Sequence, residues 1–358
     1  MKRLLPLLMA MLPSAACGAP PHVAATSTSQ ASKTALEQVP IRSLSVAQAD
    51  AEIWRPELRP AFRAPTEAQA VALEQLVPRL LDGARTGALA PDVPDLTAAT
   101  GMQLERWDVL GHAHLVLHER PEDRHGMGAY LFAITPAPLP APWMLWEAPH
   151  AYHDVDTGTI AAAMYFTPPP GPAPAAFFTN TLHRYTQIDG KRSKRSTNPA
   201  DACHDAAHPL NRATLAVART HPGATVVQLH GFGAGAAPED GDEPRLPEGT
   251  TMVVSAGVKE APTALSTAAA TRIRALLGPG VRLYPTEAGA LGATTNVEMR
   301  GLRDIPGARF LHLETAAELR SALVIDAARR DRFGALLFAL AHAASPESLP
   351  ELLPQGTP

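Results

Sequence analysis

The segment WMLWEAPHAYHDVDTGTIAAAMYF, residues 143–166, decides the architecture of this chain. It opens with the apolar run Trp143–Ala148, which is typical of a short strand buried on both faces. A polar stretch follows, and Thr159–Phe166 then has the apolar content of a short helix. A buried strand that leads into a helix is the repeating unit of a parallel sheet covered by helices.

The same order of strand and helix repeats toward the C-terminus. Short apolar runs predict strands, and longer segments ended by Gly and Pro predict helices. We expect strands at residues 175–179, 224–229, 251–255, 281–284 and 309–313, and helices at residues 210–220, 263–277 and 327–344. The sequence therefore predicts an α/β fold, with a mixed, mostly parallel sheet and helices on both faces.

Residues 63–100 are expected to form a helical N-terminal region, and residues 101–345 the α/β domain. A helix begins near Thr66, because Thr66-Glu67-Ala68-Gln69 approximates a capping box. Pro78 interrupts its apolar stripe and is expected to kink or split it.

From residue 107 the apolar period shifts toward two. This period predicts strands at residues 107–117 and 128–134. The whole region 63–135 would either extend the sheet with an antiparallel hairpin or cover the site as a lid.

The first residues predict export. A basic start, Lys2-Arg3, precedes the apolar run Leu4–Leu12 and then small residues, the pattern of a cleaved signal peptide over residues 1–17. Cys17 follows the small residues directly, as at a bacterial lipoprotein processing site. We therefore expect a periplasmic or cell-envelope protein, which is either lipid-anchored at Cys17 or released by ordinary cleavage.

Composition limits the remaining choices. Residues 18–62 are poor in apolar periodicity and are expected to form a disordered tether, and the Pro-rich tail 346–358 is expected to fray.

The chain has 2 Cys, so lipidation of Cys17 would leave only Cys203 and no disulfide framework. The net charge of −4 gives no basic field for nucleic acid. No later segment predicts a membrane span, so membrane contact is expected only through Cys17.

Polar side chains close three of the predicted strands. In open α/β sheets, binding sites form at the carboxyl ends of the strands. Glu147 and His150 end the first strand, His230 ends the strand from Ala224, and Glu314 ends the strand from Arg309. Because strand interiors in such sheets are apolar, three polar ends together predict a site.

His150 and Asp154 are four residues apart across a turn, a spacing that can bring an imidazole and a carboxylate onto one metal ion. With His230 they would form a zinc site with its fourth position open to water. Zinc would acidify that water, and Glu314 is expected to be the general base. His153 and Asp156 are rival ligands, and either Asp could instead cap the helix that follows.

Two arginines are candidates for binding a substrate carboxylate with a paired fork. Arg184 follows the strand at residues 175–179, with Asn180 beside it, and Arg300 lies with Asn296 in a Gly-flanked loop. Arg184 could equally form a surface salt bridge. Arg320, six residues after Glu314, would brace that carboxylate or face solvent.

Two further polar stretches have simpler interpretations. Asp205 and His208 are expected to be a capping or gating pair beside the site. Cys203 is not predicted to be a nucleophile, because a thiol needs a base that a third group orients. The basic run at residues 191–195 is expected to be a solvated loop, and it could also attract an anionic substrate.

The order of these motifs resembles the zinc carboxypeptidase and N-formylglutamate amidohydrolase superfamily, and most closely its bacterial members of unassigned substrate. The resemblance covers residues 143–323. Its motifs are Pro-His…Asp…Thr (His150, Asp154, Thr157), Asn-Thr…Arg (Asn180, Thr181, Arg184), Asp-x-x-His (Asp205, His208), strand-His (His230), Asn…Arg (Asn296, Arg300) and Leu-Glu…Arg (Leu313, Glu314, Arg320).

The resemblance implies a zinc-bound water that attacks an amide. It implies His150, Asp154 and His230 as ligands and Glu314 as general base, with Arg184 and Arg300 on a substrate carboxylate. Zinc carboxypeptidases space their first ligand pair as His-x-x-Glu, whereas this chain has a wider gap and an Asp.

The leading hypothesis is therefore a hydrolase with one zinc ion that cleaves an amide or peptide-like bond in a small-molecule or peptide-like substrate. A second hypothesis is a non-catalytic envelope lipoprotein that binds a small acidic ligand or a partner. A third is a metal-dependent esterase.

Overall fold

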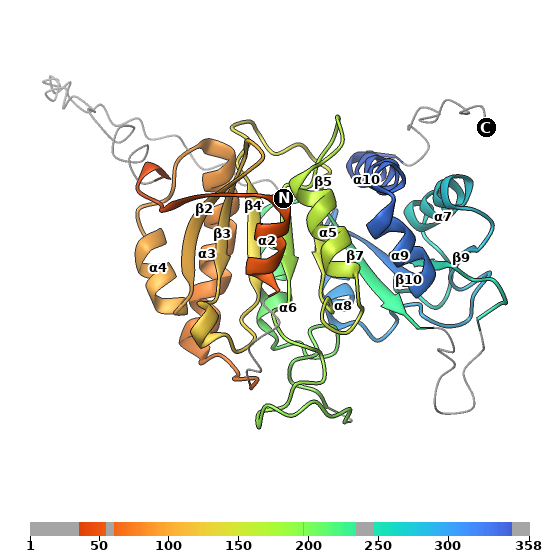
Figure 1. The fold of residues 1–358 in the computed structure, drawn as a ribbon, viewed down its shortest axis with the longest axis horizontal. Coiled ribbons are helices and arrows are strands. Elements are labelled where there is room, and N and C mark those ends of the chain that lie inside the picture. Colours follow the sequence, from red (N-terminus) through yellow and green to blue (C-terminus); the bar gives the residue numbers. More distant parts are fainter. Residues whose placement is uncertain (1–35, 55–60, 196, 234–245, 346–358) are drawn as a thin grey trace, which may run out of the picture.

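A ten-stranded sheet runs through the whole molecule (Figure 1). The computed structural model describes residues 36–54, 61–195, 197–233 and 246–345. The strands lie in the order β1 (Ile41–Leu44), β2 (Gln103–Val109), β3 (His112–His118), β4 (Ala129–Ala133), β6 (Ala176–Thr179), β5 (Trp143–Ala148), β7 (Ala224–Phe232), β10 (Arg309–Ala316), β8 (Met252–Ser255) and β9 (Val281–Leu283).

The centre of the sheet is parallel. Strands β6, β5, β7 and β10 all run in one direction, whereas β2, β3 and β4 pair antiparallel on one side and β8 pairs antiparallel with β10 on the other. The prediction of a mixed, mostly parallel sheet is confirmed.

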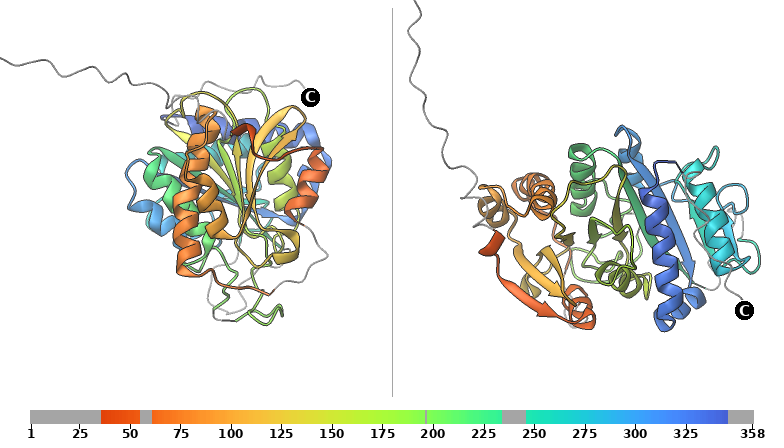
Figure 2. Two further views of the ribbon diagram at one scale, coloured as in Figure 1. Left: turned by 90° about the vertical axis from the view of Figure 1, so that its left-hand side faces the viewer. Right: turned by 90° about the horizontal axis from the view of Figure 1, so that it is seen from above.

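Helices cover both faces of the sheet, as the two views in Figure 2 show. One face packs against α2 (Val46–Ile53), α5 (Thr157–Phe166), α7 (Ala264–Leu277), α9 (Ala317–Ile325) and α10 (Ala327–His342). The other packs against α3 (Glu67–Thr86), α4 (Val93–Thr100), α6 (Pro209–Thr220) and α8 (Val297–Arg303). A single 3-10 turn, Pro121–Asp123, follows β3.

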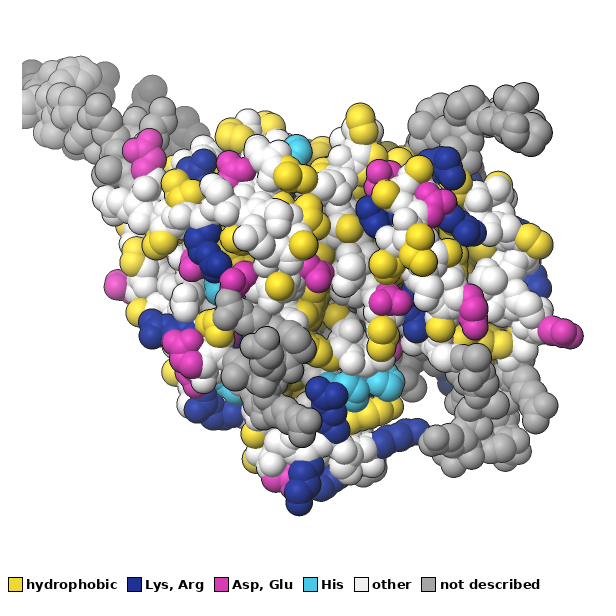
Figure 3. All heavy atoms as spheres, in the orientation of Figure 1, with side chains coloured by type: hydrophobic (Ala, Val, Ile, Leu, Met, Phe, Trp, Pro, Cys, Tyr) yellow, Lys and Arg dark blue, Asp and Glu magenta, His cyan; other side chains and the backbone are white. Residues whose placement is uncertain are grey.

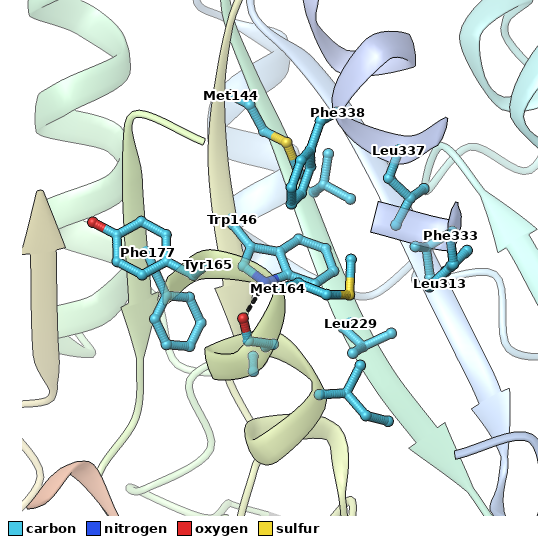
Figure 4. Packing of buried hydrophobic residues seen from close by; sticks show 14 of the residues in the cluster. Met144, Trp146, Met164, Tyr165, Phe177, Leu229, Leu313, Phe333, Leu337 and Phe338 are labelled. Carbon is cyan, nitrogen blue, oxygen red and sulfur yellow. Dashed lines mark hydrogen bonds between the residues drawn. The ribbon is translucent and has the colours of Figure 1, made fainter. Parts of the chain in front are cut away.

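Trp146 of β5 lies at the centre of the first core (Figure 4). Its indole Nε1 donates to the carbonyl oxygen of Ala161 on α5 at 3.1 Å, so the one polar atom of this buried ring is satisfied. Phe338 of α10 and Met164 of α5 pack around it, which joins the central strands to two covering helices.

Residues 36–54, predicted as part of a tether, are folded instead. Residues 41–44 form β1, an edge strand parallel to β2, and Ser45 then begins α2 with a capping box to Gln48. Ala49 and Ile53 of α2 are buried in the first core. The prediction failed because only these two positions of the short helix are fully buried, which leaves little apolar periodicity to detect. The predicted signal peptide, Cys17 and the tail 346–358 lie outside the described residues.

Residues 107–117, predicted as one strand, are the two halves of a hairpin. β2 and β3 are joined by Leu110 and Gly111, whose φ angles of 54° and 83° are both positive. A two-residue turn with positive φ at both positions matches the twist of paired strands, and Gly tolerates this conformation best. This region therefore extends the sheet, which is one of the two roles that the sequence left open.

The helix predicted from Thr66 has the expected capping box, with the Thr66 side chain accepting from the backbone of Gln69. Pro78 lies inside α3 but does not split it, since the helix continues to Thr86. Helix α3 packs in the second core together with α6, so residues 63–100 share a core with the sheet. Among the helices of the described residues, none has the length and hydropathy to cross a membrane.

Replacing Leu337 with Ala tests the packing of the first core. Leu337 of α10 is fully buried, so the smaller side chain leaves a cavity. We expect the free energy of unfolding, measured by denaturant titration, to fall by about 2–5 kcal/mol. The control Ile325→Ala, at a position 84% exposed, should change it by less than about 0.5 kcal/mol. Equal effects of the two substitutions would contradict this account of the core.

Candidate metal centre

The three polar strand ends meet at one edge of the sheet. β5, β7 and β10 are parallel neighbours, so their carboxyl ends lie side by side. In the pairing of β7 with β10, Glu314 is opposite His230 and His312 is opposite Gln228. Side chains alternate along a strand, which puts all four on the face that α6 and α8 cover, together with Val226 farther back along β7.

One turn after β5 brings His150 and Asp154 together. The backbone N–H of Asp154 donates to the carbonyl oxygen of His150 at 2.8 Å, which closes the turn. Asp154 Oδ2 then lies 3.2 Å from His230 Nδ1 and 3.9 Å from His150 Nδ1. The two imidazole rings are 4.8 Å apart, and all three residues are buried. The three predicted ligands are therefore neighbours in space.

The Nε2 atom of each imidazole lies within hydrogen-bonding distance of its own partner. His150 Nε2 lies 2.9 Å from Asp201 Oδ1, and His230 Nε2 lies 3.4 Å from Gln228 Oε1. Carboxylate and carbonyl oxygens only accept, so the His150 ring carries its proton on Nε2 and keeps its lone pair at Nδ1. Both ring nitrogens of His230 face acceptor oxygens, Gln228 Oε1 at Nε2 and Asp154 Oδ2 at Nδ1, and a metal ion between Asp154 and Nδ1 would leave the proton of this ring on Nε2.

Burial is the largest of the effects that lower the pKa of His150 and of His230, each to about 3. Both rings are therefore neutral at physiological pH. His150 Nδ1 has no hydrogen-bond partner although it is buried. A buried lone pair without a partner, beside a second imidazole and a carboxylate, fits a bound metal ion.

Cys203 is a fourth potential metal ligand, and it lies on the Nε2 side of His230. Its Sγ lies 3.7 Å from His230 Nε2, and one ligand atom each from His150, Cys203 and His230 lie within 4.8 Å of one another. Burial, reinforced by the Asp201 charge, raises the pKa of this thiol well above its usual range. Cys203 is therefore a neutral thiol in the structure described, not an activated nucleophile.

Asp201 is a residue of the centre that the sequence did not single out. It accepts from His150, from His204 at 3.1 Å and from Arg184, whose Nε and Nη2 lie 3.0 and 2.5 Å from Oδ2. Burial opposes ionisation, but the hydrogen bonds from the two histidines and the Arg184 charge outweigh it and lower the pKa of Asp201. No spacing in the sequence links Asp201 to His150, 51 residues earlier.

Arg184, predicted to bind a substrate carboxylate, holds the Asp201 carboxylate instead and is partly exposed. Asn180 is fully buried: its amide donates to the carbonyl of Ala200 at 2.8 Å and its oxygen accepts from the backbone of Leu182 at 3.1 Å. The polar groups of both residues are thus used within the loop after β6.

The stretch from Asn296 to Arg300, predicted as a loop, is the start of helix α8. Asn296 is its N-cap, accepting from the backbone of Met299 at 3.0 Å, and it donates to Gln228 at 2.8 Å. Arg300 is exposed and donates to the carbonyl of Thr294 at 3.3 Å. The short length of α8 explains why its periodicity was not visible in the sequence.

Glu314 lies beside the histidine pair with one oxygen held and the other not. His312 Nε2 is 3.3 Å from Glu314 Oε1, whereas Oε2 is buried and has no hydrogen-bond partner. The His312 ring also packs on His230, with centroids 4.6 Å apart. His312 therefore links the predicted base to a predicted ligand.

The rival and accessory candidates lie farther out. His153 is exposed and packs against Tyr185, and Asp156 occupies the N-cap position of α5 without a capping hydrogen bond. His208 caps α6 by accepting from the backbone of Leu210, while Asp205 accepts from the backbone of Ala207. These contacts match the expected capping role of His208, and they favour His150 and Asp154 over their rivals.

Arg320 braces the backbone of the centre and not Glu314. Its guanidinium donates to the carbonyl oxygens of Val155, at 2.6 Å, of Phe232, at 3.2 Å, and of Thr315. Gly231 lies directly against it, so any Cβ at that position would collide with the guanidinium. This contact fixes the loop after β5 against the end of β7.

A cavity of about 720 Å³ adjoins the centre at Asp201. Its lining includes Lys194 and Arg195 of the basic loop, together with Arg184, Asp201, His204 and Asp205. Figure 3 shows histidine and basic side chains side by side at the lower edge of this face. The cavity wall therefore has a mixed, partly basic character.

Comparisons with known proteins give distant similarities only. No family model matches the chain, and no curated protein matches it. Among solved structures, it is similar to succinylglutamate desuccinylase from Vibrio parahaemolyticus, with 10% identity and a TM-score of 0.37 over 68% of this chain and 78% of that one.

An aspartoacylase family protein from Mesorhizobium loti has 13% identity and a TM-score of 0.34, over 65% of this chain and 68% of that one. The cell shape determinant protein Csd4 from Helicobacter pylori has 13% identity and a TM-score of 0.32, over 56% of this chain and 50% of that one. Similarities of this size assign no activity, so the chemistry must follow from the site itself.

Two glutamates lie buried behind the histidine pair. Glu147 of β5 and Glu298 of α8 are fully buried and hydrogen-bonded to each other, and burial raises the pKa of both carboxyls. Two adjacent carboxyls in a dry site cannot both ionise, so they share at least one proton.

This pair makes stability depend on pH. The pKa values of Glu147 and Glu298 in the folded chain lie above the unfolded value of 4.5. As the pH rises above 4.5, the folded chain therefore binds more protons than the unfolded chain. The pair's contribution is fully present below the unfolded value and is lost as pH rises through the folded values. We expect Glu298→Gln to reduce the decline in melting temperature between about pH 5 and about pH 8. The exposed control Glu122→Gln should keep the parent slope, and equal slopes in all three proteins would refute the prediction.

Proposed function

We propose that this protein is a zinc-dependent hydrolase that cleaves an amide or peptide-like bond in a small, carboxylate-bearing substrate. One observation supports this most strongly: two buried, neutral imidazoles present their δ nitrogens to one carboxylate, with Glu314 opposite His230 on the next strand. His150, Asp154 and His230 would hold the ion, leaving a position open as catalytic zinc sites require. When bound, the zinc would polarise a carbonyl and lower the pKa of a water molecule.

Glu314 is the base in this proposal. His312 holds one of its oxygens, so the carboxylate has a fixed direction, and the other oxygen is free to accept a proton. A positioned carboxylate can take the proton of the attacking water and pass it to the leaving nitrogen. Asp201 holds the ε proton of His150, and Gln228 would accept the ε proton of His230 when the ion lies between Asp154 and Nδ1, so that both Nδ1 lone pairs serve the ion.

The cavity beside Asp201 supports a negatively charged substrate. Lys194 and Arg195 contribute cationic groups to its wall beside the Arg184–Asp201 ion pair, and the chain carries four basic residues between positions 191 and 195. Basic side chains in such a wall attract anions and can orient a carboxylate by charge. We place this activity in the cell envelope, as the N-terminal sequence predicts.

Loss of His230 tests the metal site. In the full chain, elemental analysis should find about one zinc per molecule in the parent and far less in His230→Ala, because a three-ligand site that loses an imidazole binds weakly. His112→Ala removes an exposed imidazole from β3 and should keep the parent content. Full zinc retention in His230→Ala, or no zinc in the parent after reconstitution, would contradict the proposal.

Loss of the Glu314 carboxylate tests the base. Glu314→Gln should bind zinc like the parent but lower kcat on N-acyl amino acids such as N-formyl-L-glutamate by about 10²–10⁴-fold, the usual contribution of general base catalysis. Glu318→Gln changes an exposed carboxyl on the following helix and should retain parent activity. An active Glu314→Gln variant would remove Glu314 from the reaction. Activity on simple esters with amides left untouched would instead favour a metal-dependent esterase.

A further inference from the structure

A buried polar cluster lies behind the histidine pair, between β5, β7, α6 and α8. Its members are fully or almost fully buried, and none belongs to the proposed ligands or the proposed base. Burying polar groups costs free energy unless they form hydrogen bonds. A buried polar cluster is therefore expected to serve a function that offsets this cost. The cluster consists of Glu147, Thr214, Gln228, Asn296 and Glu298.

Gln228 is the hub of the cluster, and its amide can point only one way. Gln228 Nε2 donates to Glu147 Oε2 at 2.8 Å and to Glu298 Oε1 at 3.0 Å. Gln228 Oε1 accepts from Asn296 Nδ2 at 2.8 Å. A flipped amide would put its NH₂ group against the Asn296 NH₂ group and its oxygen against carboxyl oxygens. The hydrogen bonds therefore fix the direction of the Gln228 carbonyl.

The other members of the cluster are fixed as well. Thr214 of α6 donates to Glu147 Oε1 at 2.6 Å, so each oxygen of this carboxyl accepts a hydrogen bond. Asn296 cannot turn its own amide, because its oxygen caps α8. Two helices and two strands thus hold Gln228 in place, and its side chain has little freedom left.

The remaining contact of the Gln228 carbonyl is with His230. Gln228 Oε1 lies 3.4 Å from His230 Nε2, on the same face of β7 and two residues before it. We propose that Gln228 is a positioning residue: when the metal ion lies between Asp154 and His230 Nδ1, Gln228 accepts from the ε N–H of His230 and so directs the Nδ1 lone pair toward the ion. This inference rests on the proposed metal site, and it assigns the buried cluster the task of keeping that imidazole in one tautomer and one orientation.

Cys203 is the competing partner of the same nitrogen, at 3.7 Å. If the metal ion lay between Cys203 and His230 Nε2, that nitrogen would carry no proton and Gln228 could not hold it. The two arrangements place the ion on opposite edges of one imidazole ring, so they exclude each other and can be separated by spectroscopy.

Zinc affinity tests the proposal without reference to any substrate. Competition with a chromophoric chelator should show that Gln228→Met, in the full chain, binds zinc about 10-fold or more weakly than the parent, the usual effect of losing a group that orients a ligand. Gln103→Met makes the same exchange on β2, which four strands separate from β7 in the sheet, and should bind zinc like the parent. Circular dichroism of the metal-free proteins establishes that each variant folds.

If Gln228→Met does not fold, Gln228→Asn replaces it, because this variant keeps an amide in the cluster but withdraws the carbonyl from His230. The same loss of affinity is then expected. Unchanged zinc affinity in the folded Gln228 variant would overturn the proposal while leaving the metal site intact. A parent that binds no zinc would instead overturn the proposed function, and this inference with it.

Cobalt(II) supplies the second readout. The cobalt-loaded parent should lack thiolate-to-cobalt charge-transfer absorption in the near ultraviolet, and Cys203→Ser should leave its spectrum unchanged. A charge-transfer band that disappears in Cys203→Ser would put the ion on the Nε2 edge and overturn the role of Gln228.

Discussion

The parallel pairing of β7 with β10 is the constraint on which the candidate centre depends. This register sets Glu314 opposite His230, and the alternation of side chains along each strand puts both on the face toward α6 and α8. A shift of one residue would move His230 to the opposite face and bring Leu229 into the centre. The apolar residues of β5, β7 and β10 that fill the opposite core, such as Trp146, therefore also hold the polar centre in position.

Desolvation then determines the chemistry of the buried groups. Both imidazoles are neutral because water is excluded from them, and a neutral imidazole is the form that binds a metal ion. Asp201 remains ionised under the same burial because two histidines donate to it and Arg184 lies beside it. Glu147 and Glu298 have no cation within their cluster, and they accommodate burial by keeping a proton.

The loop between β6 and α6 contributes more to the centre than its irregular sequence indicates. It supplies Arg184, Asp201 and Cys203, and its basic segment forms part of the wall of the adjoining cavity. Loops that follow strands of a rigid sheet can carry such groups because the sheet fixes both of their ends. Under the proposed function, substrate preference is expected to lie in this loop, whereas the proposed metal ligands come from a strand end and from the tight turn after β5.

The sequence by itself determined the α/β class, the central strands and the polar ends that meet at one edge, because apolar periodicity and strand-end polarity are local patterns. It also brought out His150, Asp154 and His230, which are neighbours in the structure. It missed α2, whose few buried positions leave almost no period. Only the tertiary structure decided the partners of the imidazoles, Asp201 and Gln228. The Asp201 contact spans 51 residues, and the Gln228 amide is fixed by Glu147 of β5 and by the start of α8, about 70 residues or more away in sequence, so no local spacing encodes either.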